Sequence, residues 1–449
     1  MAFPGQINKS MEDAMGHITN PEQEYRILQQ RLDQKVQGAP YSLTLMKILN
    51  MLFSPEDAAL AWKLPHNFTP LETLSDNLKI PKDELNDKLT DMAQRGLVFD
   101  IEHKGQRYFT LPPVVIGFFE FTFMRTRSDM PMKELARLFE KYFYENENFV
   151  RTHYQGQTQL FRSLVREEAI PASDHTEILD WERATHIVSS ASSISVGICQ
   201  CHHTAQLLEQ ACNRPQETCL TFNFAAESLS RNGIARAITK DEAINILGKC
   251  KESGLAQTGD NVRRKVNFIC NCCGCCCHVM RALKTFDLHP GIVTSNWIMK
   301  VDQDKCKGCG ECAKACPVDA ININEKKEGD KTKKWAVLTE KTCLGCGVCS
   351  TKCKTGAATM KSRPQRVVVP ETVFEQRVAM AIERGKLSDL LFDDPGKFSH
   401  RAMGLVIRLL ENSAPFKAAL ARESIKSSFL NIIVKGAKKS AGDLAELVT

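Results

Sequence analysis

Eight cysteines between residues 306 and 353 form two runs with the same internal spacing. The first run is Cys306-x2-Cys309-x2-Cys312-x3-Cys316-Pro317, and the second is Cys343-x2-Cys346-x2-Cys349-x3-Cys353. When the runs are superposed, Gly308 matches Gly345 and Gly310 matches Gly347. Thiolates at this spacing are typical of iron–sulfur cluster ligation. Zinc also uses CxxC pairs, but it needs only four ligands per ion and gives no reason for two repeated runs.

The spacing also indicates how the two runs share their ligands. In such a run three thiolates on a tight loop bind one cubane, and the fourth begins a short helix and binds the other cluster. We therefore expect cluster I to be held by Cys306, Cys309, Cys312 and Cys353, and cluster II by Cys343, Cys346, Cys349 and Cys316. Glycines between the ligands allow positive φ and bring backbone N–H groups close to the sulfurs. Two clusters that exchange a ligand are close neighbours, as an electron relay requires.

On these motifs, residues 301–362 resemble a bacterial-type dicluster ferredoxin domain. The resemblance implies two [4Fe–4S] clusters and one-electron transfer. The chain departs from the family pattern at Lys354, which follows the second run where the first has Pro317. Ligation does not depend on this residue, but the rigidity of the turn and the potential of the nearby cluster do.

A second cysteine-rich region lies upstream of the two runs. Its cysteines are Cys199, Cys201, Cys212, Cys219, Cys270, Cys272, Cys273, Cys275, Cys276 and Cys277. Those from 270 to 277 are too closely spaced to be core side chains only, because neighbouring side chains point in different directions. We expect at least one additional Fe–S cluster here, with zinc, a redox-active thiol group or free thiols as the alternatives. The spacing does not indicate which of the ten thiols are ligands.

Four further residues of this region bear on the site. His202, His203 and His278 are candidate ligands, although a histidine beside a metal is more typically a hydrogen-bond donor. Cys250 stands apart in a helical pattern and is expected to be a buried thiol.

The segments ICQCHHTA, NRPQETC and FICNCCGCCCHVMRAL extend the resemblance to about residues 175–362. They are similar to anaerobe 4Fe–4S binding proteins that carry a CxC…CNCCGCCC region before a dicluster ferredoxin domain. This resemblance implies an electron carrier of anaerobic metabolism and supplies no substrate.

Composition limits the class of protein. The chain has 449 residues, of which 43% are hydrophobic and 25% charged, so it is neither disordered nor dominated by membrane spans. Its formal charge of +6 is small for a dedicated nucleic-acid binder. The cysteines are odd in number, many of them are nearly adjacent, and no secretory signal is visible, so we expect the reducing cytoplasm rather than a disulfide framework.

The remaining chain must position these cysteines, and we expect an α+β multidomain architecture. Its expected parts are an N-terminal helical lead-in (1–41), a winged-helix-like domain (42–125), a helical connector (126–195), a helical cysteine-rich domain (196–300), the dicluster ferredoxin domain (301–362) and a helical C-terminal region (363–449). We expect the helical lead-in to be exposed to solvent. The winged-helix expectation rests on three helical segments followed by an alternating hairpin with Lys104-Gly105 at its tip. The apolar stretch VVIGFFEFTFM after the hairpin is expected to be core.

Two segments bear on possible partners. The helix expected over residues 81–95 carries three basic and four acidic side chains, which works against DNA binding and favours docking to protein. The basic, amphipathic C-terminal stretch ARESIKSSFLNIIVKGAKK is compatible with an anionic membrane surface, but packing on protein is favoured.

The sequence contains no GxGxxG after a strand, no GxxxxGK[ST] and no HExxH, and no catalytic residue is identified. It therefore predicts a relay of single electrons between a redox donor and acceptor, as a subunit of an oxidoreductase or docked to one. Whether the chain is itself an enzyme stays open. The alternatives are an oxidoreductase subunit with a substrate-active cluster in the region Cys199–Cys277, and a redox-sensing winged-helix regulator.

Overall fold

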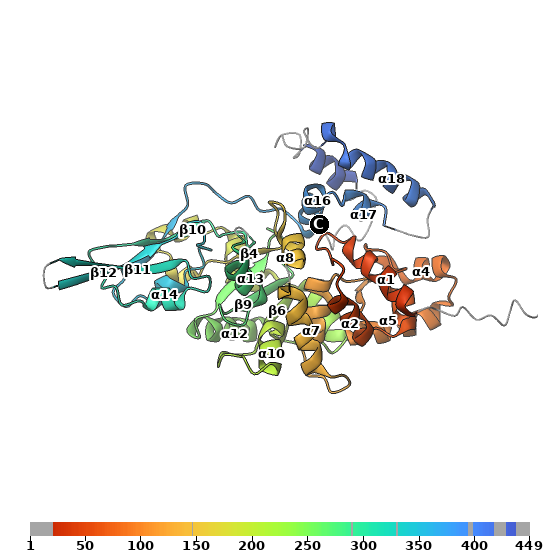
Figure 1. Cartoon of the computed structure of the whole chain (residues 1–449), viewed down its shortest axis with the longest axis horizontal. Coiled ribbons are helices and arrows are strands. Elements are labelled where there is room, and N and C mark those ends of the chain that lie inside the picture. Colours follow the sequence, from red (N-terminus) through yellow and green to blue (C-terminus); the bar gives the residue numbers. More distant parts are fainter. Residues whose placement is uncertain are drawn as a thin grey trace, which may run out of the picture.

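A computed structural model describes residues 21–145, 147–288, 291–328, 331–393, 398–416 and 428–436. The described part mixes helix and sheet, as expected. In Figure 1 the N-terminal helices lie at one end of an elongated molecule, and the segment with the two cysteine runs (306–353) lies at the other. The largest sheet lies between them.

The N-terminal part contains five helices and a small antiparallel sheet. The helices are α1 (Pro21–Asp33), α2 (Leu43–Leu52), α3 (Pro55–Ala61), α4 (Leu71–Leu78) and α5 (Lys82–Arg95). The strands are β1 (Thr69–Pro70), β2 (Phe99–His103) and β3 (Gln106–Thr110), in the order β1-β3-β2. Ser42 and Ser54 cap α2 and α3 through their side chains. The expected hairpin is present, with Lys104 and Gly105 at its turn.

Helix α1 is not the solvated lead-in that we expected. Tyr25, Leu28 and Leu32 are buried in the same core as α2. These apolar residues recur at helical spacing and form a stripe, which the many charged residues between them obscure in the sequence. Residues 1–20 of the lead-in lie outside the described residues.

An aromatic cluster connects this helical part to the cysteine-rich region. It is built from an irregular segment (Val114–Phe118), α6 (Phe119–Phe123), α7 (Met132–Tyr144) and α8 (Glu147–Tyr154). The ring centroids of Phe119 and Phe139 lie 4.8 Å apart, and those of Phe143 and His278 lie 5.1 Å apart. The expectation that the stretch after the hairpin is core is confirmed, because most of its apolar side chains are buried.

A six-stranded antiparallel sheet lies at the centre of the cysteine-rich region. Its strands, in the order β4-β8-β9-β6-β5-β7, are β4 (Phe161–Ser163), β8 (Ala256–Asp260), β9 (Phe268–Cys272), β6 (Glu217–Phe222), β5 (Ile194–Ile198) and β7 (Arg236–Ala237). The accompanying helices are α9 (Ala184–Ser190), α10 (Gln200–Leu207), α11 (Asn223–Arg231), α12 (Lys240–Glu252) and α13 (His278–Phe286). Short 3-10 turns occur at Glu167–Ala169, Ala172–Glu177 and Asp180–Glu182.

This sheet corrects the expectation of a helical cysteine-rich domain. The helices predicted around residues 223–255 are present, but the two-residue strand β7 separates them, and five further strands of three to six residues complete the sheet. Strand β4, which lies in the segment expected to be a helical connector, pairs with β8 at the sheet edge. Such short strands carry little local signal because they are stabilised by pairing with segments distant in the sequence.

The dicluster module repeats a loop, a short helix and a strand. Its elements are β10 (Trp297–Val301), α14 (Glu311–Ala315), β11 (Ile321–Glu328), β12 (Lys331–Leu338), α15 (Val348–Lys352) and β13 (Ala358–Ser362). Strand β10 pairs with β13 and β11 pairs with β12, both antiparallel. The β11–β12 hairpin projects from one end of the molecule (Figure 1).

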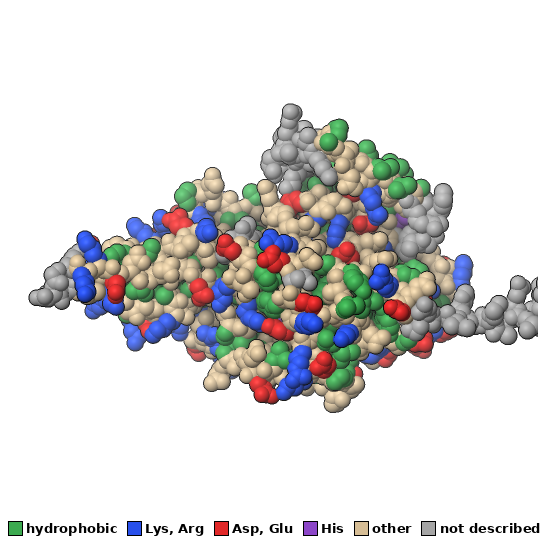
Figure 2. Space-filling view, viewed as in Figure 1, with side chains coloured by type: hydrophobic (Ala, Val, Ile, Leu, Met, Phe, Trp, Pro, Cys, Tyr) green, Lys and Arg blue, Asp and Glu red, His purple; other side chains and the backbone are tan. Residues whose placement is uncertain are grey.

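The C-terminal helices return to the N-terminal ones. They are α16 (Val373–Arg384), α17 (Leu387–Leu391), α18 (Phe398–Asn412) and a helical segment over 428–436. The side chain of Lys386 donates to the carbonyl of Lys35, 2.8 Å away. Leu405, Val406 and Leu409 of α18 are 61%, 51% and 67% exposed, and hydrophobic side chains gather over this helix in Figure 2.

Other expectations for the C-terminal region are only partly covered by the structure. Most of the basic tail stretch lies outside the described residues. In the described part of the chain, no helix is both long and apolar enough to cross a membrane.

The buried carboxylate of Asp100 joins the N-terminal hairpin to the cysteine-rich region. Asp100 is 0% exposed, and its oxygens accept hydrogen bonds from Arg107 (2.9 Å), Ser228 (3.0 Å), Arg231 (2.9 Å) and Asn232 (2.7 Å). Burial raises the pKa of Asp100, but these partners outweigh burial and lower the pKa below its usual 3.8.

We expect Asp100→Ala to lower the free energy of unfolding by about 3 kcal/mol, because two arginines lose their buried partner. The contribution of Asp100 should be present above its usual pKa and be lost as the pH falls through the lower folded value. Denaturant unfolding at neutral and acidic pH measures both effects. A variant as stable as the parent at pH 7 would contradict this role.

Candidate iron–sulfur and metal sites

The two cysteine runs lie on loops whose backbone N–H groups point at sulfur atoms. The Sγ of Cys306 accepts from the N–H of Ala336 at 3.4 Å, and the Sγ of Cys316 accepts from Ala320 at 3.2 Å. Cys353 accepts likewise from Ala358 at 3.4 Å. Such donors stabilise negative charge on the sulfurs, and in iron–sulfur proteins they raise the reduction potential.

The structure brings the fourth cysteine of each run next to the other run. A small cavity is lined by Cys316, Cys343, Cys346 and Cys349, the set expected for cluster II. Cys312 interacts electrostatically with Cys353, Cys306 and Cys309, the rest of the set expected for cluster I. Burial raises the pKa of Cys346 to about 12, so this thiol needs a cation to become a thiolate at neutral pH. The donor set and its enclosure fit a thiolate-ligated cluster.

Glycines allow these loops to pack closely against the neighbouring strands. Gly345 has a φ of +73°, and a Cβ there would lie 2.1 Å from the carbonyl oxygen of Trp297. Gly308 has a φ of +60°, and a Cβ there would lie 2.3 Å from the Cβ of Lys334. The glycines at these matched positions are therefore required by both conformation and space.

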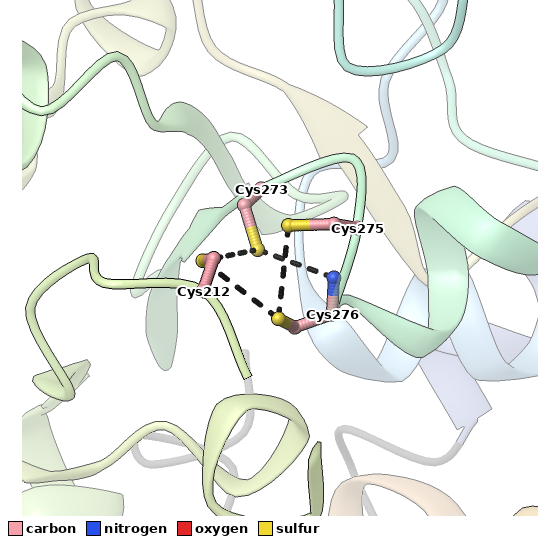
Figure 3. Close-up of side chains that lie close together, drawn as sticks. All are labelled: Cys212, Cys273, Cys275 and Cys276. Carbon is pink, nitrogen blue, oxygen red and sulfur yellow. Dashed lines mark hydrogen bonds between the residues drawn. The ribbon is translucent and has the colours of Figure 1, made fainter. Parts of the chain in front are cut away.

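Four upstream cysteines form a compact group, which we call the thiol tetrad: Cys212, Cys273, Cys275 and Cys276. Their Sγ atoms all lie within 4.8 Å of one another (Figure 3). Cys212 lies in the loop after α10, and the other three lie in the turn after β9. The N–H of Cys276 donates to the Sγ of Cys273 at 3.3 Å. Hydrogen bonds from Cys276 lower the pKa of Cys273 to about 4, which favours a thiolate.

The other six of these ten cysteines, which we call the chamber thiols, lie around an apolar cavity that Cys273 and Cys276 of the tetrad also line. They are Cys199, Cys201, Cys219, Cys270, Cys272 and Cys277, and all but Cys219 line the cavity. Their sulfurs form a connected chain. Cys201 interacts with Cys199 and Cys277, and Cys270 interacts with Cys219 and Cys272. Cys272 and Cys277 link the two ends. Hydrogen bonds from Cys201 and Cys272 are the main cause that lowers the pKa of Cys277. Backbone N–H groups at the start of α13 lower this pKa further.

The cavity also contains groups that the sequence did not single out. Its other lining residues include Phe119, Glu120, Tyr144 and Tyr154. Burial raises the pKa of Glu120 to about 7. The volume open to the centres of water molecules is about 60 Å³, whereas a single water needs only about 10–15 Å³. The cavity can therefore hold several waters or a small molecule.

The three candidate histidines all have hydrogen-bond partners. The Nε2 of His202 lies 2.7 Å from the carbonyl oxygen and 3.3 Å from the Sγ of Cys212. The Nδ1 of His203 lies 2.8 Å from the carbonyl of Phe123, and the Nε2 of His278 lies 3.2 Å from the Oγ1 of Thr204. The contact of His202 is of the kind that orients a ligand from outside the ligand set.

Cys250 is a buried thiol, as expected. It is 0% exposed on α12, it packs in the same apolar cluster as Cys273 and Cys276, and burial raises its pKa to about 12.

Backbone packing places the thiol tetrad beside the dicluster module. A Cβ on Gly274 would lie 2.5 Å from the carbonyl oxygen of Pro317, the residue that follows Cys316. The tetrad loop therefore packs directly on the turn of a cysteine expected to bind cluster II. The sequence offered only one signal for this contact, a glycine between cysteines, which is typical of close backbone approach.

Arg166 is a second link that sequence reasoning missed. Its guanidinium is buried and donates to the Oγ1 of Thr351 at 2.7 Å and to the carbonyls of Lys251 and Leu255, each at 2.9 Å. Its backbone N–H donates to the carbonyl of Cys346 at 3.1 Å. Arg166 thus places a buried cation between the sheet and the second cysteine run, where it can offset thiolate charge.

Comparison with known families identifies one part of the chain. Residues 305–357 match the family described as the 4Fe-4S dicluster domain. This segment includes all eight cysteines of the two runs. No curated protein and no solved structure matches the chain. The match indicates that this segment binds 4Fe-4S clusters.

We expect Gly345→Ala to impair cluster binding, because its Cβ would collide with the backbone at Trp297. Gly356→Ala is the matched control, since Gly356 has a φ of +66° but nothing within 4 Å of the added Cβ. The control should lose only about 1–2 kcal/mol of stability, which is the cost of placing a non-glycine residue in the left-handed backbone conformation. Iron per chain and the urea midpoint for loss of cluster absorbance measure the difference. Equal losses in both variants would mean that the packing at Gly345 is unimportant.

Proposed function

We propose that this protein relays single electrons through two [4Fe–4S] clusters to or from a partner redox enzyme. The observation that carries the proposal is the cavity lined by Cys316, Cys343, Cys346 and Cys349 within a 4Fe-4S dicluster domain. Each cluster supplies a site that accepts or donates one electron. The chain binds the clusters and adjusts their potentials through N–H donors and buried charge.

The crossed ligand sets are part of this proposal. Cluster I is assigned to Cys306, Cys309, Cys312 and Cys353, and cluster II to Cys343, Cys346, Cys349 and Cys316. The electrostatic neighbours of Cys312 and the lining of the cavity support these sets. Each fourth ligand directly follows a short helix, instead of beginning one as expected: Cys316 follows α14 and Cys353 follows α15. These two helices therefore bring the two clusters close together.

The relay extends upstream through a further metal centre. The contact of Gly274 with Pro317 supports this extension, because it gives the upstream cysteines a short path to cluster II. In this arrangement electrons enter or leave through the upstream centre, pass cluster II and reach cluster I at the opposite end.

Partners and setting follow from the sequence resemblance. We assign the protein to the cytoplasm and to anaerobic metabolism. Its redox donor and acceptor dock to it or share a complex with it. Residues 42–125 serve as a winged-helix-like docking domain. The acidic character of α5 supports protein docking over DNA binding, and the exposed apolar side chains of α18 offer a second contact surface.

A second candidate function is supported by the cavity at the chamber thiols. An oxidoreductase needs a cluster beside a space for substrate and a group that exchanges protons near neutral pH. The cavity offers such a space, and it is also lined by Glu120, whose pKa is about 7. In this alternative a cluster held by the chamber thiols is the site of chemistry, and the dicluster module supplies its electrons.

We expect anaerobically purified protein to contain at least about eight irons and eight sulfides per chain, because each cubane holds four of each. EPR of the reduced protein should show two interacting clusters. In Cys353→Ala the cluster I signal should be lost or altered, although Cys353 belongs to the second run. Loss of cluster II alone would contradict the crossed ligation.

Cys250→Ala is the control for this variant, because Cys250 is buried but belongs to neither run. It should keep both clusters. Protein that stays colourless and poor in iron after reconstitution under anaerobic conditions would exclude the electron-relay function altogether.

If the second candidate holds, a small ligand such as cyanide should perturb one cluster signal and leave the two dicluster signals unchanged. The expected reason is an iron with an open coordination position at the cavity. Glu120→Gln should change the pH dependence of that perturbation, since the proton-exchanging carboxyl is removed. EPR at several pH values measures both effects, and signals insensitive to the ligand favour the pure relay.

A further inference from the structure

The four sulfurs of the thiol tetrad have the spacing of a single coordination tetrahedron. The Sγ of Cys212 lies 3.9 Å from that of Cys273 and 3.8 Å from that of Cys276, and Cys275 and Cys276 are 3.7 Å apart. All remaining pairs lie within 4.8 Å. A metal ion bound to four thiolates at about 2.3 Å places neighbouring sulfurs about 3.8 Å apart. The distances from Cys212 to Cys273 and Cys276, and from Cys275 to Cys276, agree with this value.

The same spacing does not suit a cubane. In a [4Fe–4S] cluster each thiolate binds a different iron, so its ligand sulfurs lie further apart than those that share one ion. The chain contains its own comparison, because neither set of four cysteines in the dicluster module forms such a close group. Among the described residues, the tetrad is the one group of three or more potential ligands with atoms this close.

The surroundings of the tetrad are those of a thiolate-rich metal site. Four thiolates around a divalent ion leave a net charge of about −2, which needs nearby donors and cations. The Nη1 of Arg214 lies 3.7 Å from the Sγ of Cys275 and 4.0 Å from that of Cys212. The N–H of Cys276 donates to Cys273, and the ring of His202 lies beside Cys212. Cys275 is exposed, so an ion can reach the site from solvent.

We propose that Cys212, Cys273, Cys275 and Cys276 bind one tetrahedral metal ion, Zn²⁺ or Fe²⁺, without inorganic sulfide. All four positions are taken by protein, so the site has no open position for a substrate. Cys273 and Cys276 also line the cavity of the chamber thiols, but their sulfurs are taken by this ion, so any further Fe–S cluster of this region belongs to the six chamber thiols.

The bound ion has a structural consequence for the relay. It fixes the turn that contains Gly274, and this turn packs on Pro317 next to Cys316. With zinc, the ion braces the junction between the sheet and the dicluster module. With iron, it is also a one-electron site adjacent to cluster II.

The test compares Cys275→Ala with Cys250→Ala in the full chain, both purified anaerobically. Cys275 is exposed, so its replacement removes a ligand with little effect on packing. We expect Cys275→Ala to lose about one metal ion per chain and no sulfide, whereas Cys250→Ala keeps the full content. Loss of about four irons with an equal amount of sulfide would overturn the proposal, and so would unchanged metal content.

A measurement on the unaltered protein serves if Cys275→Ala does not fold. If the site holds zinc, X-ray absorption at the zinc edge should give one shell of four sulfurs at about 2.3 Å and no neighbouring metal. If it holds iron, Mössbauer spectra should contain one high-spin tetrahedral iron apart from the cubane irons. Absence of both signatures contradicts the tetrad assignment, while intact dicluster spectra would leave the electron relay standing.

Discussion

The contact between Gly274 and Pro317 is the constraint on which the arrangement of sulfur sites depends. A glycine is required because any side chain at residue 274 would overlap the backbone at Pro317. One side of this contact is the loop of the thiol tetrad, and the other is the turn after Cys316. The two cysteine-rich regions, whose nearest cysteines are Cys277 and Cys306, thereby become neighbours. Their separation is set by backbone packing, which side-chain rotation cannot change.

Concentrated thiolate charge is the second condition that the fold must meet. Bringing many sulfurs together in an apolar interior disfavours their ionised form, as the raised pKa of Cys346 illustrates. In the structure, backbone N–H donors such as that of Ala320, together with arginines, offset this charge. Arg166 is buried between the sheet and the second cysteine run, and Arg214 lies at the tetrad. Arg166 comes from a part of the chain without cysteines, whereas Arg214 follows closely after Cys212.

Local pattern predicted some elements of the fold well and others poorly. The hairpin with Lys104 and Gly105 at its turn was predicted because alternation and turn residues are local signals. The buried role of α1 was missed because charged residues obscure its apolar stripe. The six-stranded sheet was missed because strands as short as β4 are defined by their partners. A partner distant in the sequence leaves no mark within a three-residue segment.

The sequence by itself determined the chemistry of the dicluster module. Spacing within each run fixes which thiols can share a loop, and this information is local. Only the tertiary structure decided how the ten upstream cysteines divide between the thiol tetrad and the chamber thiols. Cys276 and Cys277 are adjacent in the sequence but belong to different groups, because consecutive side chains point in different directions. Which sulfurs meet therefore depended on the packing of β9, α10 and α13 against one another.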